Sequence, residues 1–190
     1  MKELKKWLSC RKCRLWKTRR KVVLGRGVHP ADVLLVGLAP GKSEDLVGDP
    51  FVGEAGRILD SALRWVRKRI GHKLSIYITN LVGCRPCVDN VKTSGNRDPE
   101  KDEIIACWPR VQKTISLVQP RAIVLLGKVS QGSLLKYYPD AISLSHPAYI
   151  LRRGGENSSE FRSFVRGLTE VFKGLKVKKK TLFESGRSEQ

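Results

Sequence analysis

The sequence lacks any apolar run that approaches the length of a membrane-spanning helix. Such a helix needs about 20 consecutive, mostly apolar residues, and the N-terminal stretch is charged and has no apolar centre of the kind found in secretory signals. We therefore expect a cytoplasmic protein with no membrane partner. Aromatic residues make up only 7% of the chain, but hydrophobic residues together reach 41% of 190 residues, which is enough for a packed core without disulfides.

Acidic residues are scarce. The chain has 18 Asp and Glu against 37 Lys and Arg, so its formal net charge is +19. The first 30 residues hold 11 Lys and Arg but only Glu3 as an acid, and the last residues are again rich in lysine. A domain this basic usually has a polyanionic partner, most often nucleic acid. General solubility or adaptation to heat is the alternative explanation of the charge.

Internal repeats and low-complexity linkers are also missing, and strand and helix patterns alternate instead. Short runs rich in Val, Ile and Leu predict buried strands. Apolar residues at helical spacing predict helices between and after them. The predicted strands are 31–37, 75–79, 121–127 and 141–145, and the predicted helices are 54–70, 98–119, 128–138 and 157–173. At the start of the second helix, Asp98 is the expected N-cap and Pro99 the first helical residue.

Strands that are joined by crossover helices run parallel, with helices on both faces of their sheet. The sequence therefore predicts a three-layer α/β/α sandwich with a four-stranded parallel sheet. We expect residues 1–174 to form one domain and residues 175–190 to form a basic, frayed tail. In such sheets ligands bind beyond the carboxyl ends of the strands.

Each predicted strand delivers a glycine turn or a polar residue to this edge. Leu38 and Ala39 follow the first strand, Asn80 follows the second, and His146 follows the fourth. Phe51 lies between two glycines in the loop after the first strand, where an aromatic ring either joins the core or forms a stacking platform for a base. Taken singly, the glycine turn, the asparagine and the histidine also fit plain turn or capping roles.

Five cysteines suggest a metal centre, because disulfides are rare in the cytosol. Cys10 and Cys13 form one C-x-x-C pair, and Cys84 and Cys87 form another. Cys107 lies two to three turns into a predicted helix, which points it back toward the loop that holds Cys84. Four thiolates could therefore converge on one zinc ion or iron–sulfur cluster.

With these strand-end residues and cysteines, the sequence resembles the family 4 uracil-DNA glycosylases, the iron–sulfur type of bacteria and archaea. The matching stretches occur in the family's order from residue 10 to about residue 152, which is about three quarters of the chain. They are CRKCRL, GLAPGKSED, GDPFVGEAGRILD, YITNLVGCRP, NRDPEKDEIIAC and HPAYILR.

The resemblance implies the uracil-DNA glycosylase fold, hydrolysis of the N-glycosidic bond of uracil in single- or double-stranded DNA, and a [4Fe–4S] cluster. The expected cluster ligands are Cys10, Cys13, Cys84 and Cys107, with Cys87 as a spare that could exchange with Cys84. The expected uracil-binding residues are Leu38, Ala39, Phe51, Asn80 and His146.

Two departures from the family pattern bear on function. Leu38 stands where the family usually has glutamate, and it resembles the first motif of family 5, whose members accept more bases. A broader-specificity glycosylase that accepts hypoxanthine, or a non-catalytic DNA-damage-binding protein, is therefore the alternative function. The loop between Cys84 and Cys107 also carries about seven extra residues, within 88–95, which are expected to reshape a DNA-facing surface.

The remaining expectations concern the reaction and its partners. His146 is the expected stabiliser of the departing uracil anion. Glu44 is favoured to orient the attacking water; Asp45 or main-chain carbonyls near Leu38 are the other candidates, and loop capping is the alternative role of both acids. Just past the histidine, Leu151, Arg152 and Arg153 are expected to contact DNA, with the leucine as an apolar wedge. We also expect a monomer, and Leu182-Phe183 is a weak candidate for docking to a sliding clamp.

Overall fold

The computed structural model describes residues 2–71, 74–88, 94–127, 132 and 134–176. Its sheet has the strand order β1-β3-β2-β4-β5. The strands are β1 (Arg26–Gly27), β2 (Val33–Gly37), β3 (Ile76–Asn80), β4 (Ala122–Leu126) and β5 (Ile142–Leu144). The α-helices are α1 (Lys2–Lys5), α2 (Lys42–Val47), α3 (Glu54–Ile70), α4 (Lys101–Val118), α6 (Pro147–Arg152) and α7 (Ser159–Lys176), and the short 3-10 helices are η1 (Lys6–Ser9), η2 (Arg14–Lys17) and η4 (Gly155–Asn157).

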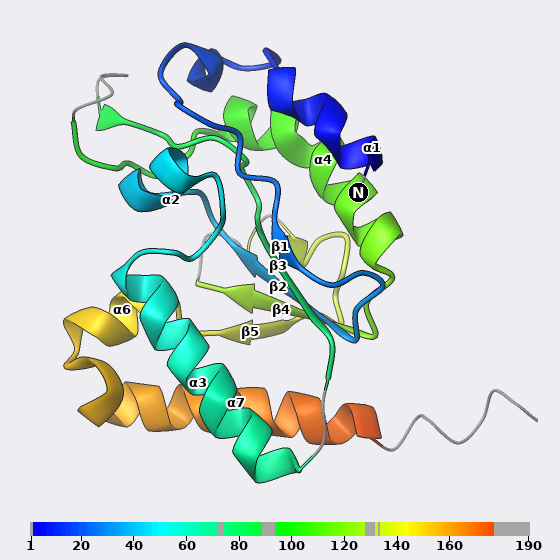
Figure 1. The fold of residues 1–190 in the computed structure, drawn as a ribbon, viewed down its shortest axis with the longest axis vertical. Coiled ribbons are helices and arrows are strands. Elements are labelled where there is room, and N and C mark those ends of the chain that lie inside the picture. Colours follow the sequence, from blue (N-terminus) through cyan, green and yellow to red (C-terminus); the bar gives the residue numbers. More distant parts are fainter. Residues whose placement is uncertain (1, 72–73, 89–93, 128–131, 133, 177–190) are drawn as a thin grey trace, which may run out of the picture.

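Helices cover both faces of the sheet (Figure 1). Strand β2 is buried along its whole length, and its side chains alternate between two core clusters. Val33 and Leu35 pack with α3, α6 and α7 on one face, whereas Leu34 and Val36 pack with α4 on the other. This alternation is the period of two that a strand imposes, and it confirms the predicted three-layer architecture.

The four predicted strands are all present and mutually parallel. The sheet nevertheless has a fifth strand, because β1 pairs with β3 in the antiparallel direction. The prediction of four strands was therefore wrong by one. Two residues are too short to carry a period of alternating side chains, and one of them is Gly27, whose φ of 120° lets its backbone lie against Ile76.

Among the helices, α3 has the predicted bounds and α7 lies close to the predicted range. The start of α4 differs from the prediction, because its N-cap is Glu100 and not Asp98. The Glu103 carboxylate accepts a hydrogen bond from the Glu100 amide, as in a capping box. Residues 128–131 and 133 of the predicted helix at 128–138 lie outside the described residues, as does the part of the tail beyond Lys176.

None of the described helices is long and apolar enough to cross a membrane. The carboxyl ends of the parallel strands meet on the left in Figure 1, beside α2, α6 and the start of α3. This edge is where the predicted site residues are expected to meet.

Candidate active site at the carboxyl edge of the sheet

Two of the predicted binding residues, Asn80 and Phe51, pack tightly against the end of β2. Gly37 pairs in register with Asn80. A Cβ atom on Gly37 would lie 2.4 Å from Asn80 Oδ1 and 2.7 Å from Phe51 Cζ. Glycine is therefore required here, because any side chain would displace the amide and the ring from their positions.

The Phe51 ring is held by its backbone. Phe51 has a φ of 55°, which is rare for a residue with a side chain. Its carbonyl accepts a hydrogen bond from Arg26, which is itself paired with Asp60 at 2.7 Å. Gly56 of α3 lets this carbonyl approach the helix, since a Cβ there would lie 1.8 Å from it. Strain of this kind persists only where the surroundings enforce it.

Glu44 connects the two loops that flank the site. Its carboxylate accepts hydrogen bonds from the backbone N–H groups of Gly41 at 3.1 Å and of Val52 and Gly53 at 3.0 Å each. These bonds correspond to the loop-capping role that was the alternative for this residue. Asp45 lies away from the site, because its carboxylate accepts the backbone N–H groups of residues 20 and 21.

His146 is the N-cap of α6 and faces the Phe51 ring, with 5.9 Å between the ring centroids. Its Nδ1 atom accepts a hydrogen bond from the Ala148 amide at 3.1 Å. The neutral ring therefore carries its proton on Nε2. Burial, together with the positive charge of Arg152, lowers the pKa of His146 from 6.5 to about 4. The imidazole is thus neutral at physiological pH, a state that sequence reasoning left open.

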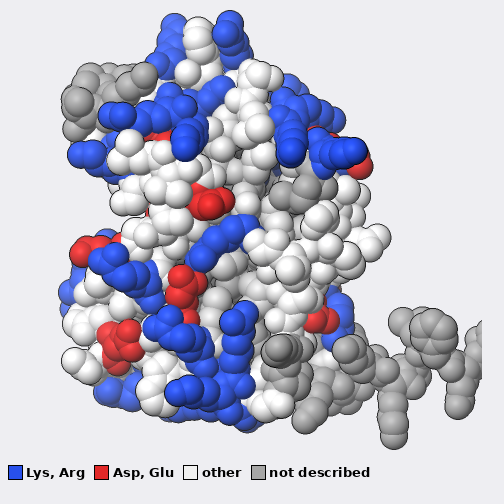
Figure 2. Space-filling view, in the orientation of Figure 1, with Lys and Arg blue, Asp and Glu red and all other residues white. Residues whose placement is uncertain are grey.

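These residues enclose a cavity of about 370 Å³. Ala39, Glu44, Phe51, Asn80 and His146 all contribute to its walls. Asn80 is 2% exposed, and its side chain has no hydrogen-bond partner among the described residues. An unpaired amide in an otherwise buried setting is suited to a polar ligand. In Figure 2 the outline of the molecule is indented at this edge.

Leu38 belongs to a second cavity, of about 430 Å³, that shares Ala39 and His146 with the first. The Leu38 side chain packs on the core beneath α4, and its carbonyl accepts the Val82 amide at 2.9 Å. Leu38 is therefore absent from the walls of the first cavity. This carbonyl, a candidate for orienting water, is already bonded.

The residues expected to contact DNA lie at the end of α6. Leu151 is half-buried and packs against the core beside α3 and α7. Arg152 and Arg153 are exposed; the first lines the second cavity and the second pairs with Glu160 at 3.1 Å. Their proposed contacts with DNA remain a prediction.

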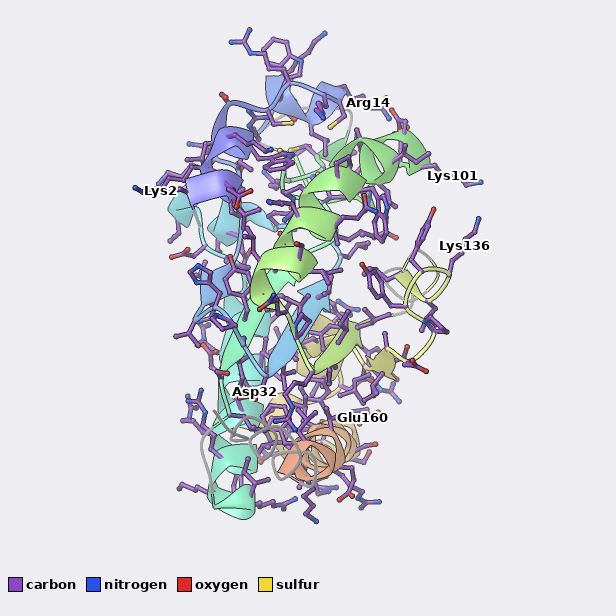
Figure 3. The ribbon with its side chains drawn as sticks, turned by 90° about the vertical axis from the view of Figure 1, so that its right-hand side faces the viewer. Lys2, Arg14, Asp32, Lys101, Lys136 and Glu160 are labelled. Carbon is purple, nitrogen blue, oxygen red and sulfur yellow. The ribbon has the colours of Figure 1, made fainter. Side chains whose placement is uncertain are left out.

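The cysteines gather on the other side of the first motif. Cys84 and Cys107 are buried together in a small core cluster, and Cys13 packs against it. Burial raises the pKa of Cys84 to about 12, and the neighbouring Cys13 and Cys107 add to this shift. Burial also raises the pKa of Cys13, and the neighbouring Cys10 adds to this shift. Figure 3 shows sulfur atoms close to Arg14, between the N-terminal segment and α4.

This arrangement is suited to a thiolate-bound cluster, although the described residues contain no group of three potential ligands already arranged to hold a metal ion. Arg19 and the Gly83 amide donate to the sulfur atoms of Cys84 and Cys107, at 3.6 and 3.4 Å. Such donors stabilise a thiolate, and bound metal would supply the charge that favours it. The residues therefore fit the group that their pattern implies.

Cys87 is buried elsewhere. Its backbone pairs with that of Asn96 in an isolated antiparallel β-bridge. Its thiol donates to the Arg85 carbonyl, with 3.9 Å between the sulfur and the oxygen. Cys87 is not a member of the core cluster that holds Cys84 and Cys107. This placement favours Cys84 as the ligand from the second pair.

Glu103 is a structural residue that the sequence analysis missed. It is fully buried on α4 and pairs with Arg97 at 2.7 Å and with Arg14 at 3.1 Å. These hydrogen bonds hold the pKa of Glu103 below its usual value despite the opposing effect of burial. Arg14 adjoins Cys13, so the carboxylate ties the N-terminal cysteine segment to α4. The i, i+3 spacing of Glu100 and Glu103 was the available signal.

Asn96 and Ala148 were also missed, and both line the two cavities. Asn96 is held by Arg85 through a hydrogen bond of 2.6 Å. Its place as the first residue of the N-R-D-P motif was a signal, but Ala148 carries none, because its contribution is a backbone N–H group. Residues 89–93 of the predicted insertion lie outside the described residues.

Comparison with known proteins places this geometry in a family. The model of the Uracil DNA glycosylase superfamily matches residues 24–169. The chain is also similar to the type-4 uracil-DNA glycosylase of Saccharolobus solfataricus, with 42% identity over 129 residues, which cover 67% of the chain and 55% of the relative.

Two other relatives carry the same description. The type-4 uracil-DNA glycosylase of Sulfurisphaera tokodaii is 38% identical over 167 residues, covering 87% of the chain and 64% of the relative. That of Thermotoga maritima is 32% identical over 178 residues, covering 83% and 84%. The chain thus spans 55% to 64% of the length of the first two relatives, but most of the third.

Proposed function

The chain belongs to the type-4 uracil-DNA glycosylase family, and on this premise we propose that it removes uracil from DNA by hydrolysing the N-glycosidic bond and leaving an abasic site. The single observation that carries the proposal is the cavity in which Phe51, Asn80 and His146 converge. A ring, an unpaired amide and a neutral imidazole are the groups needed to stack on, recognise and activate a flat pyrimidine.

The base must first leave the duplex, at a cost of a few kcal/mol in stacking and pairing. Phe51 then stacks on the extruded ring. The Asn80 amide pairs with the uracil edge and discriminates against cytosine, whose exocyclic amine reverses the donor and acceptor pattern. A mismatched base is rejected because it leaves buried polar groups unpaired.

Cleavage of the bond from C1′ to the base leaves a cation-like sugar and a uracil anion. The Nε2–H group of His146 donates to the pyrimidine O2 and stabilises this anion, helped by backbone N–H groups of the first motif. Water adds to C1′, and its proton is released. Glu44 lines the cavity and is the proposed orienting group for this water; its three backbone bonds leave about one of its roughly four acceptor positions unused.

The cofactor belongs to the same proposal. Cys10, Cys13, Cys84 and Cys107 would hold a [4Fe–4S] cluster, which supplies a cross-link between the N-terminal segment and α4. Hydrolysis transfers no electron, so the proposed role of the cluster is structural. We further propose a monomer in the cytoplasm, with residues 1–174 as one domain and any clamp contact limited to Leu182-Phe183, which lie outside the described residues.

DNA is the proposed partner, and the distribution of charge supports it. Lys and Arg side chains gather over the N-terminal segment and along α3 (Figure 2). The Arg152 and Arg153 side chains at the end of α6 are exposed beside the second cavity. Basic groups on either side of the site are suited to binding phosphates.

A single-turnover cleavage assay tests the proposal. Oligonucleotides would carry uracil opposite guanine, uracil opposite adenine, single-stranded uracil, hypoxanthine or only normal bases, and alkali would reveal abasic sites. We expect cleavage at uracil and none at cytosine or thymine. Release of hypoxanthine as well would indicate the broader specificity suggested by Leu38. No release from any substrate would contradict the proposal and favour a DNA-damage-binding protein.

A further inference from the structure

Arg110 is buried directly behind the proposed uracil-binding residue. It is the largest fully buried side chain among the described residues, with 1% exposure, and it lies on α4. One amino group donates to Thr79 Oγ1 at 3.2 Å and to the Leu24 carbonyl at 3.4 Å. The other donates to the carbonyls of Asn80 and, at 3.0 Å, of Leu81.

This guanidinium has no carboxylate partner within the described part of the chain. Its Nε atom also has no hydrogen-bond partner there. Burying a cation without a counter-ion costs free energy. An apolar residue would be enough to fill this space. The charge of Arg110 and the rigid fork of N–H donors on its guanidinium group therefore need another explanation.

The explanation lies in the segment that the fork holds. The backbone of Asn80 faces Arg110, whereas its side chain faces the cavity and is closely confined by Gly37. Three residues further on, the Gly83 amide donates to Cys107, one helical turn from Arg110 on α4. A Cβ atom on Gly83 would lie 3.1 Å from Arg110 Nε, so this segment lies closely on the helix.

We propose that Arg110 is a positioning residue for uracil recognition: its fork fixes the backbone of Asn80 on α4 and thereby orients the Asn80 amide toward the base. Because Cys107 lies one helical turn away on the same helix, the cysteine centre and the base pocket share one support. This inference rests on the proposed function. It names the residue that gives the Asn80 amide the orientation on which recognition of uracil depends.

A double-mutant cycle on the single-turnover rate of uracil release tests the inference. Arg110→Met should slow release about 10- to 100-fold, the range expected when a recognition group is displaced by up to about 1 Å. In an Asn80→Ala background the same substitution should change the rate less than about twofold, because the group through which Arg110 acts is gone. Where Arg110→Met does not fold, Arg110→Lys takes its place in the cycle.

Arg121→Met is the matched control. Arg121 is an exposed residue whose side chain is 27% accessible; it pairs with Asp32 at 3.2 Å and lies at the amino end of β4, the opposite edge of the sheet. It should lower the stability of the fold but leave the uracil rate within about twofold of the parent at temperatures where both are folded. Equal losses of rate in the Arg110 and Arg121 variants, or additive losses in the Asn80→Ala background, would overturn the inference.

A readout without substrate separates this inference from the proposed function. The side-chain amide resonances of Asn80, identified by their loss in Asn80→Ala, should shift or broaden in Arg110→Met but not in Arg121→Met. If the parent releases no uracil, the proposed function fails, and the resonances alone decide whether Arg110 orients Asn80. Unchanged resonances would overturn the positioning role.

Discussion

At the scale of single residues, the site depends on groups whose state is set by backbone neighbours. The Ala148 amide determines which nitrogen of His146 carries the proton, and burial keeps the ring neutral. His146 could be predicted as a site residue because it follows a strand. Its protonation state could not, because that depends on a backbone amide two residues later and on burial.

His146→Ala should lower the single-turnover rate of uracil release by about 10²- to 10³-fold, the usual cost of removing one donor to a developing anion. DNA binding, measured by fluorescence anisotropy, should change little, since the imidazole faces the base and not the phosphates. An unchanged rate would remove His146 from the mechanism.

The pH dependence follows from the direction of the shift in the same pKa. The folded pKa of about 4 lies below the ordinary 6.5, so the unfolded chain binds the proton more readily between these values. Stability contributed by His146 is therefore complete above about pH 6.5 and is lost as the pH falls toward 4. We expect the rate of uracil release to be constant from pH 8 to about pH 5.5. At lower pH the rate should fall, because protonation of Nδ1 breaks the hydrogen bond from the Ala148 amide. Chemical denaturation of His146→Ala across the same range should lack this component.

Gly37→Ala tests the close approach of β2 to the pocket. The added methyl group would meet Asn80 and Phe51 at sub-van der Waals distances. Overpacking of this kind costs about 1–3 kcal/mol of folding stability, and we expect a larger proportional loss of uracil release than of DNA binding. Gly174→Ala, on α7, is the control: an added Cβ there meets no atom of the described residues within 4 Å, so the release of uracil should be unchanged.

At the scale of elements, α4 connects two functions that are separate in the sequence. It carries Cys107 toward the cysteine centre and Glu103 toward the N-terminal segment. The existence of this helix was predicted from its N-terminal signals, a capping acid followed by proline and by further acids in the first turn. Its starting residue was not, because the reciprocal bond of Glu103 decides between Asp98 and Glu100 as the cap. Arg110 was missed because a buried and an exposed arginine look alike in a basic sequence.

Cysteine substitutions should separate the ligands from the spare. Cys107→Ala should lose iron and most soluble expression, because it removes a ligand and loosens α4, whereas Cys87→Ala should keep its iron. Iron content and absorbance near 400 nm measure the difference. Iron lost from Cys87→Ala and kept in Cys107→Ala would reverse the assignment of the fourth ligand.

At the scale of the whole molecule, the net charge of +19 governs how the protein meets DNA. If six or more phosphates are neutralised, affinity should fall about 10³-fold or more between 50 and 200 mM salt. Anisotropy titrations over this range measure the slope. A slope close to zero would indicate that the charge serves solubility and not binding.

The overall architecture was the most predictable part of the molecule, because the burial of β2 and β3 on both faces leaves continuous apolar runs in the sequence. The β1 strand escaped prediction because pairing of two residues, one of them Gly27, depends on the neighbouring strand and not on local pattern. The site residues could be predicted where they follow a strand. The bonds that fix them come from distant segments, as when Arg26 holds Phe51.

The pairing of β2 with β3 does not stop where the strands end. The amides of Leu81 and Val82 still bond to the carbonyls of Gly37 and Leu38, at 2.8 and 2.9 Å. The backbone that carries Asn80 into the pocket is thus an extension of the most deeply buried part of the sheet, and these two amides should exchange with deuterium as slowly as those of β3. A pocket supported by backbone this stiff does not reshape itself around a misfitting base. The deformation that recognition requires is therefore made by the DNA. We expect uracil to be released faster where the neighbouring base pairs unstack easily.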